Sequence, residues 1–124
     1  MKNASPSQVL IVDANADSAE VLHAVFQRKG IETISARQPQ KGIQLARSYD
    51  PDVIVLDVES LNGEDISTDD FLDSNKEQPA RLLLLGNLRQ QEKESGSDAI
   101  LAKPYHFAAL IRKIEGLLVD SRAA

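Results

Sequence analysis

Three short runs of apolar residues in this chain each end at a charged side chain. They are Val9–Val12 followed by Asp13, Val53–Leu56 followed by Asp57, and Ala99–Ala102 followed by Lys103. Such runs are typical of strands that are buried on both faces of a parallel sheet. The carboxyl ends of parallel strands meet at one edge of the sheet, where open α/β folds bind their ligands. We therefore predict that two carboxylates and one ammonium line a single acidic pocket.

Strand-like and helix-like segments alternate along the chain, which is typical of a parallel sheet flanked by helices. The expected strands are 9–12, 32–36, 53–56, 82–85 and 99–102. Five helices are expected. The first begins at Asp17 or Ser18, and the second runs from Pro39 to about Ser48. The third begins near the capping-box pattern Ser67-Thr68-Asp69-Asp70, the fourth lies within the polar stretch 86–97, and the fifth begins near Phe107. The third and fourth should be short. We predict one α/β domain of (βα)5 order, a five-stranded parallel sheet with helices on both faces.

Apolar spacing predicts the buried faces of the first and last helices. The first helix should end at Gly30 and bury Val21, Leu22, Val25 and Phe26. The last helix should dock on the sheet through a stripe of apolar residues at spacings of three and four. That stripe consists of Phe107, Leu110, Ile111, Ile114, Leu117 and Leu118.

The bulk composition excludes several classes of protein. With 124 residues, 42% of them hydrophobic, the chain has the size and apolar content of one globular domain. A net charge of −5 argues against direct contact with nucleic acid. The absence of cysteine excludes disulfides, thiolate metal sites and thiol nucleophiles.

Neither a targeting signal nor a membrane span is predicted. Residues 1–7 form a polar leader without the apolar core of a signal peptide. The longest apolar run, Leu82–Leu85, is far too short to cross a bilayer. We therefore predict a cytoplasmic domain over residues 8–120, followed by a short tail at 121–124.

Taken in order, the motifs of this chain resemble the receiver domain of bacterial response regulators, the CheY-like family with a flavodoxin-like fold. The matching residues are Val9–Asp13, Asp17, Gly30, Pro51–Asp57, Gly96-Ser97-Asp98 and Lys103-Pro104-Tyr105. Each motif is weak alone, whereas their order and spacing together are specific. The resemblance implies a non-enzymatic module of two-component (phosphorelay) signalling. Its implied partners are a histidine kinase or another signalling protein, and a second copy of the chain in a homodimer.

In receivers, the residue at the position of Asp57 accepts a phosphoryl group, because a carboxylate can attack phosphorus to form an acyl phosphate. Mg²⁺ and a lysine neutralise the charge of the group in transfer. The resemblance assigns Asp13 to the Mg²⁺ site and Lys103 to the phosphoryl group. It also implies that Pro104 follows a cis peptide bond, which aims the lysine inward.

The chain departs from the family pattern at the metal site. The second acid after the first strand, which binds Mg²⁺ in the family, is Ala14 here. The loss of one carboxylate from a site made mostly of water and carboxylate should weaken Mg²⁺ binding. Glu59 lies two residues after Asp57, and its side chain either restores the lost charge or is simply solvated. The expected site is thus a weak one, formed by Asp13, Asp57 and Glu59.

The chain also departs from the family pattern at the switch that senses the phosphoryl group. Receivers carry Ser or Thr at the end of the fourth strand, where this chain has Gly86, or Asn87 if the register differs by one. The aromatic partner of that hydroxyl, three residues before the lysine, is Ile100. Coupling to a distant surface needs an element with two arrangements that the ligand distinguishes. Both halves of the usual element are therefore absent from the sequence.

Two hypotheses follow from these matches and departures. In the first, the chain is a receiver module with Asp57 as its phosphoacceptor, an impaired Mg²⁺ site and no Ser/Thr or aromatic switch. In the second, it is a pseudo-receiver that acts as a phosphorylation-independent protein-interaction module. Lys103 then only balances the charges of Asp13 and Asp57, because a nearby ammonium relieves the repulsion between two carboxylates.

Overall fold

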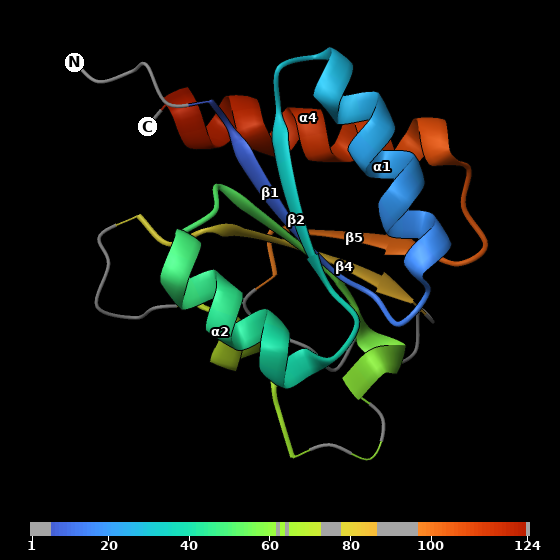
Figure 1. Cartoon of the computed structure of the whole chain (residues 1–124), viewed down its shortest axis with the longest axis vertical. Coiled ribbons are helices and arrows are strands. Elements are labelled where there is room, and N and C mark those ends of the chain that lie inside the picture. Colours follow the sequence, from blue (N-terminus) through green and yellow to red (C-terminus); the bar gives the residue numbers. More distant parts are fainter. Residues whose placement is uncertain (1–5, 62, 64, 73–77, 87–96, 124) are drawn as a thin grey trace.

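The computed structural model describes residues 6–61, 63, 65–72, 78–86 and 97–123, and the side chains among them up to residue 119. Five parallel strands form one sheet in the order β2-β1-β3-β4-β5: β1 (Gln8–Val12), β2 (Glu32–Ala36), β3 (Val53–Asp57), β4 (Arg81–Gly86) and β5 (Ala99–Ala102). The helices are α1 (Ala16–Arg28), α2 (Pro39–Tyr49) and α4 (Phe107–Ala123), together with the 3₁₀ turns η1 (Val58–Leu61) and η2 (Thr68–Phe71). Figure 1 shows this arrangement, which confirms the predicted parallel α/β fold.

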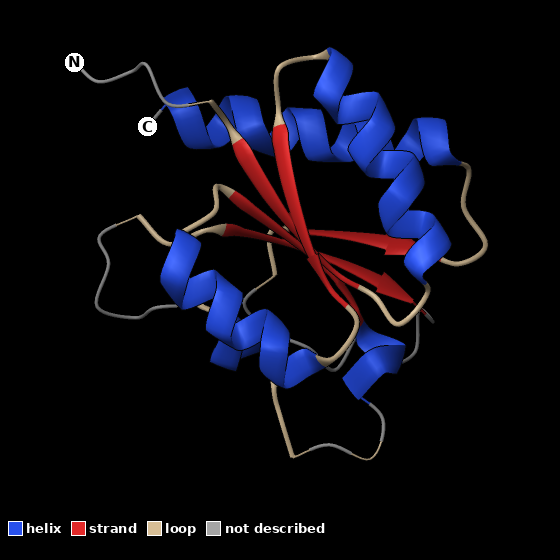
Figure 2. Ribbon diagram, in the orientation of Figure 1, coloured by secondary structure: helices blue, strands red, loops and turns tan. Residues whose placement is uncertain are grey.

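Helices cover both faces of the sheet, as Figure 2 shows. Side chains alternate between the two faces of each strand, so the central strands contribute to two separate cores. One core joins the sheet to α1 and α4 through Val9, Ile11, Leu22, Phe26, Val53, Val55, Leu83, Leu85, Leu110 and Ile114. The other joins it to η2 through Leu10, Val12, Ile54, Leu56, Leu82, Leu84 and Phe71, with side chains of α2 packed against them. The unbroken apolar runs of β1, β3 and β4 follow from this burial on both sides.

The first helix begins earlier than predicted, because its cap is Asn15. The Asn15 side chain accepts a hydrogen bond from the backbone N–H of Asp17 at 2.9 Å. Asn is among the preferred residues at this position, since its oxygen satisfies an N–H that the helix leaves unpaired. The prediction of Asp17 or Ser18 as the cap was therefore wrong, and both residues lie inside α1.

The buried face of α1 is narrower than predicted. Leu22 and Phe26 are buried, as expected, and Val25 is partly buried. Val21 is 42% exposed, which contradicts the prediction. One residue along a helix turns the side chain by about 100°, so Val21 points away from the face that carries Leu22. The helix ends as predicted, with Gly30 at a positive φ of 76° that favours glycine.

The third helix is a 3₁₀ turn, not an α-helix. The predicted capping box is confirmed: the Ser67 N–H donates to the Asp70 side chain at 2.9 Å, and the Ser67 side chain accepts from the Asp70 backbone. The turn nevertheless ends after four residues, at Phe71. The short fourth helix predicted within 86–97 falls on residues 87–96, which are outside the described residues.

The last helix docks on the sheet through most of the predicted stripe. Leu110, Ile114, Leu117 and Leu118 are buried, and Ile111 is partly buried. Phe107 is 37% exposed, so its predicted burial was wrong. It is the first residue of α4, and its side chain lines an open pocket instead of the core.

Candidate functional site

Asp57 is the last residue of β3, and its carboxylate is almost completely buried, with 6% of the residue exposed. One carboxylate oxygen, Oδ1, accepts the backbone N–H of Glu59 at 3.0 Å. The other, Oδ2, accepts from Lys103 Nζ at 2.6 Å. The Ser60 hydroxyl donates to the Asp57 carbonyl oxygen and closes the turn that follows the strand. Both carboxylate oxygens are therefore held in place by the chain.

Asp13 directly follows β1 and is buried to the same extent, with 6% exposed. Its Oδ1 accepts the backbone N–H of Asn15 at 2.9 Å, which leads the chain into α1. Burial raises the pKa of the Asp13 carboxyl, and the negative charge of Asp57 raises it further. The hydrogen bond from Asn15 and the charge of Lys103 oppose this rise without cancelling it. The structure thus brings the two acids together, as the sequence predicted.

Lys103 follows β5, and the Lys103–Pro104 peptide bond is cis, as predicted. Burial lowers the pKa of the Lys103 ammonium, but the hydrogen bond and charge of Asp57 outweigh burial, so that the pKa is raised overall. Nζ also lies 3.6 Å from Glu59 Oε1, on a side chain that is 51% exposed. The ammonium therefore bridges a buried carboxylate and an exposed one.

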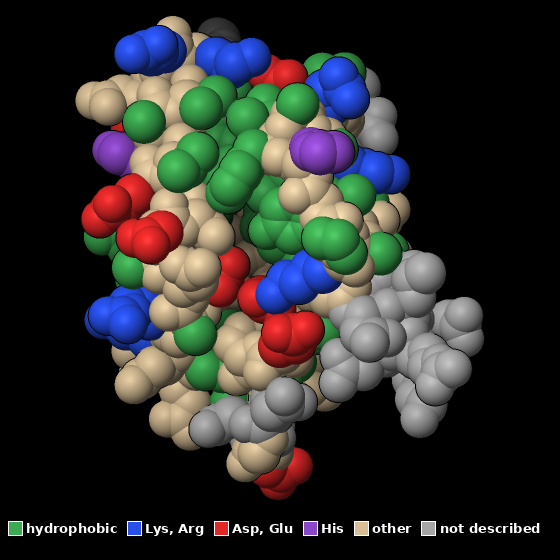
Figure 3. Space-filling view, turned by 90° about the vertical axis from the view of Figure 1, so that its right-hand side faces the viewer, with side chains coloured by type: hydrophobic (Ala, Val, Ile, Leu, Met, Phe, Trp, Pro, Cys, Tyr) green, Lys and Arg blue, Asp and Glu red, His purple; other side chains and the backbone are tan. Residues whose placement is uncertain are grey.

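These groups line an open pocket of about 620 Å³ at the carboxyl edge of the sheet. Figure 3 faces this edge and shows acidic and basic side chains gathered together below an apolar surface. The residues that line the pocket are Asp13, Asn15, Ser18, Asp57, Glu59, Lys103, Pro104, Tyr105 and Phe107. The predicted convergence of three strand ends into one acidic pocket is thus confirmed.

The donor set fits a hard cation only in part. Asp13 and Asp57 offer two neighbouring carboxylates. Burial and the negative charge of Asp57 both raise the pKa of Asp13, and a cation would relieve the repulsion between the two acids. Within the described residues, however, no three His, Cys, Asp or Glu side chains are grouped closely enough to hold a metal ion. Ala14 is exposed and supplies no ligand. Two carboxylates suit Mg²⁺, which keeps several of its waters, and a site with so few protein ligands is expected to bind weakly.

The two switch positions lie where the resemblance places them. Gly86 ends β4 next to β5 and accepts the backbone N–H of Lys103 at 3.0 Å. Its φ is 152°, a value that side-chain-bearing residues rarely adopt. Ile100 pairs with Leu84 across the sheet and is 37% exposed. The alternative position, Asn87, lies outside the described residues.

Four residues that line the pocket were not predicted from the sequence to be part of the site, namely Asn15, Ser18, Tyr105 and Phe107. In the sequence, Tyr105 is the last residue of the Lys103-Pro104-Tyr105 motif. Its position three residues beyond the end of β5 was a usable signal, because residues just past strand ends gather at the ligand-binding edge.

Comparison with known proteins identifies the family. The polar-differentiation response regulator DivK of Brucella anthropi is 24% identical over 122 residues, which cover 94% of this chain and 99% of DivK. The transcriptional regulatory protein CusR of Escherichia coli K12 is 33% identical over 116 residues, or 90% of this chain. This chain belongs to the receiver domains of response regulators. The receiver domain spans about half the length of CusR, with 51% of that protein covered.

Solved structures show the same fold. The receiver domain of a response regulator from Bermanella marisrubri superposes with a TM-score of 0.68 at 19% identity, covering 92% of this chain and 99% of that one. The chemotaxis protein CheY4 of Vibrio cholerae superposes with a TM-score of 0.69 at 18% identity, covering 91% and 99%. No protein-family model matches this receiver domain. Among its described helices, none is both long and apolar enough to cross a membrane.

Proposed function

We propose that this receiver domain works in two-component signalling by accepting a phosphoryl group on Asp57, with a histidine kinase or another signalling protein as its partner. The supporting observation is the buried Asp57 carboxylate, which contacts Lys103 Nζ at 2.6 Å inside an open pocket. A donor can reach this carboxylate from solvent, and the ammonium is already in place to stabilise the added charge. The domain then acts as a signalling module and not as an enzyme.

The transfer that we propose is a displacement at phosphorus. A carboxylate oxygen of Asp57 attacks the phosphorus of the donor and forms a P–O bond, while the bond from phosphorus to the leaving group breaks. The leaving group departs with the electron pair of that bond, and Asp57 becomes an acyl phosphate. Lys103 remains paired with the site throughout, so that its charge offsets the added phosphoryl oxygens.

In this proposal Mg²⁺ is held by Asp13 and Asp57, with Glu59 as the third acidic group at the mouth of the pocket. When bound, the ion would neutralise charge on the transferring phosphoryl group. The half-exposed Glu59 carboxylate lies 3.6 Å from Lys103 Nζ, which keeps a further negative charge beside the ammonium that pairs with Asp57. A cytoplasmic location, pairing with a second copy and the lack of direct nucleic-acid contact belong to the same proposal.

The test is the intact mass of the protein after incubation with acetyl phosphate and Mg²⁺. One phosphoryl group should be added to the wild type and none to Asp57→Asn, which keeps the shape of the side chain but lacks the nucleophile. Omission of Mg²⁺ should reduce the modified fraction. An unchanged wild-type mass, under conditions that modify an ordinary receiver domain, would refute the proposal.

A second function is favoured by one observation: Gly86 has no hydroxyl, and its backbone conformation is one that serine and threonine avoid. We propose as the alternative a pseudo-receiver, which binds a partner protein without phosphorylation. In that case Asp57→Ala, once shown to be folded, keeps partner binding and cellular function. A loss of function in the folded variant contradicts the alternative and favours phosphorylation.

A further inference from the structure

Two hydroxyl-bearing side chains line the described part of the Asp57 pocket, namely Ser18 and Tyr105. A phosphoryl group on Asp57 would bring oxygens that accept hydrogen bonds, and Lys103 already donates to this carboxylate. Gly86 cannot donate from a side chain. A hydroxyl donor to that phosphoryl group must therefore come from another residue, and the two candidates in the pocket lining are Ser18 and Tyr105.

The Tyr105 ring is held in a defined position. It is half-buried and packs against the core that joins the sheet to α1 and α4. Its ring meets the ring of Phe107 edge to face, with centroids 6.1 Å apart and an angle of 85° between the planes. This geometry is favourable for aromatic pairs. Because Tyr105 lies two residues after Lys103, the same strand end positions both the ammonium and the phenol.

The charges of the pocket act on the Tyr105 hydroxyl. Burial raises the pKa of the phenol, and the negative charges of Asp13 and Asp57 add to this rise against the opposing charge of Lys103. The phenol is therefore protonated at neutral pH and available as a donor. Within the described residues, its hydroxyl makes no hydrogen bond to the protein.

We propose that the Tyr105 hydroxyl is the donor that this pocket offers to the phosphoryl group on Asp57, in place of a hydroxyl at the end of β4. The inference rests on the proposed phosphorylation of Asp57. Tyr105 is thus a residue that binds the phosphoryl group, and its hydroxyl donates this hydrogen bond only when Asp57 is phosphorylated. The arrangement joins phosphate recognition to the start of α4 through the contact between Tyr105 and Phe107.

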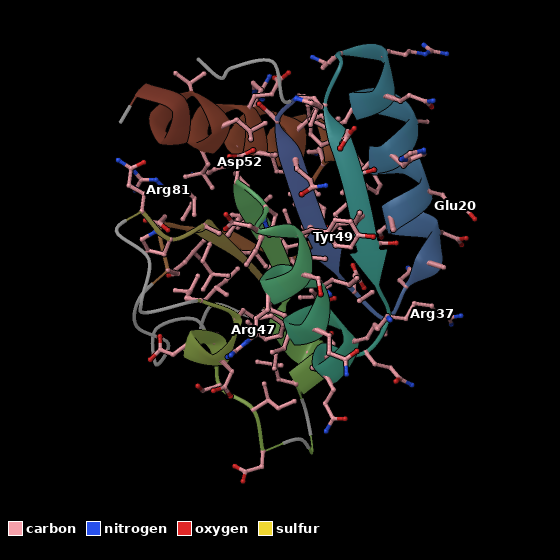
Figure 4. All side chains as sticks on the ribbon, turned by 60° about the vertical axis from the view of Figure 1, so that its left-hand side comes forward. Glu20, Arg37, Arg47, Tyr49, Asp52 and Arg81 are labelled. Atoms are coloured by element: carbon pink, nitrogen blue, oxygen red, sulfur yellow. The ribbon has the colours of Figure 1, made fainter. Side chains whose placement is uncertain are left out.

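The chain offers a matched control, because it contains two tyrosines and no tryptophan. The other tyrosine, Tyr49, is the last residue of α2 and is 54% exposed. Figure 4 labels Tyr49 at the end of α2, and this residue is not among those that line the Asp57 pocket. In Tyr49→Phe, all tyrosine absorbance and fluorescence therefore come from Tyr105.

The probe is beryllium fluoride with Mg²⁺, which mimics a phosphoryl group on a carboxylate. In Tyr49→Phe, its addition should change the tyrosine spectrum, and a second substitution of Asp57→Asn should abolish that change. Binding measured by ¹⁹F NMR should be about tenfold weaker in Tyr105→Phe than in the wild type, the size expected for loss of one hydrogen bond to a charged group. Tyr49→Phe should bind as the wild type does. Tyr105→Phe removes only the hydroxyl and keeps the ring contact with Phe107, so it should fold normally.

Each outcome has a distinct meaning. Equal affinities of the wild type and Tyr105→Phe overturn the role of Tyr105 but leave phosphorylation of Asp57 intact. A selective loss in Ser18→Ala, with Tyr105→Phe unaffected, assigns the donor to Ser18 and also overturns the inference. No binding of beryllium fluoride and no mass increase of the wild type with acetyl phosphate overturn the inference together with the proposed function.

Discussion

Gly42 allows α2 to lie against β1, and its replacement by alanine tests how tightly the fold is packed beneath the pocket. A Cβ atom added at residue 42 would lie 2.7 Å from Cγ2 of Val12 and 3.1 Å from Cε2 of Phe71. Val12 is fully buried and Phe71 nearly so. A buried valine has little freedom to rotate, because branching at Cβ restricts its side chain. The backbone of α2 or β1 must therefore move to admit the methyl group.

Two opposing contributions set the size of the effect. Alanine is favoured over glycine inside a helix by about 0.8–1 kcal/mol. Overpacking a well-packed core costs about 1–3 kcal/mol. We expect Gly42→Ala to lower the free energy of unfolding by about 1 kcal/mol. Because Val12 is followed directly by Asp13, the displacement should also weaken binding of beryllium fluoride in the pocket.

Gly116 provides the matched substitution in α4. A Cβ atom at this position has no neighbour within 4 Å, so Gly116→Ala should gain the helix preference alone, about 1 kcal/mol. Urea unfolding of both variants, with unchanged m-values, measures the two free energies on the same scale. If Gly42→Ala proved as stable as Gly116→Ala, the argument for a tight contact between α2 and β1 would be refuted.

Three further substitutions test the electrostatics and backbone of the site. Asp13→Asn should raise the free energy of unfolding near neutral pH by on the order of 1–2 kcal/mol, because the pKa of the buried Asp13 carboxyl lies above its ordinary value of 3.8. Urea unfolding should show that the gain vanishes below pH 3.8, where the wild-type carboxyl is protonated in both the folded and the unfolded state. Lys103→Gln should cost about 1–2 kcal/mol near neutral pH in thermal unfolding, a loss that fades as the pH rises through the raised lysine pKa, above 10.5. Equal losses at neutral and strongly alkaline pH would contradict the role given to the ammonium. Gly86→Ser should destabilise the fold by about 1–3 kcal/mol, because the φ of 152° at this position is strained for a residue with a side chain. The variant should bind beryllium fluoride no more tightly than the wild type. Tighter binding would show that the missing hydroxyl alone limits the site.

The sequence was sufficient to predict the layout of the fold. Apolar runs located β1, β3, β4 and β5 to within one residue at each end, the alternation of segments located the more polar β2, and helical spacing located α1 and α4. These features follow from side-chain periodicity, which is a property of neighbouring residues along the chain. The convergence of Asp13, Asp57 and Lys103 followed as well, because parallel strands place their carboxyl ends at one edge.

Other features depended on the folded arrangement. Val21 and Phe107 fit the apolar pattern but lie outside the cores, because burial depends on which element covers a helix face. The cap of α1 is Asn15, since the chain turns directly after Asp13 to begin the helix. Glu59 approaches Lys103 only because β3 and β5 end at the same edge, on either side of β4.

The sequence by itself determined which residues end the strands, and with them the acidic pocket and the family. Only the tertiary structure decided that Lys103 bridges two carboxylates and that the phenol of Tyr105 shares the pocket with Asp57. The physical reason is the distance along the chain between the residues that interact. Periodicity and capping act over a few residues, whereas contact between side chains from different strands depends on the register and packing of the whole sheet.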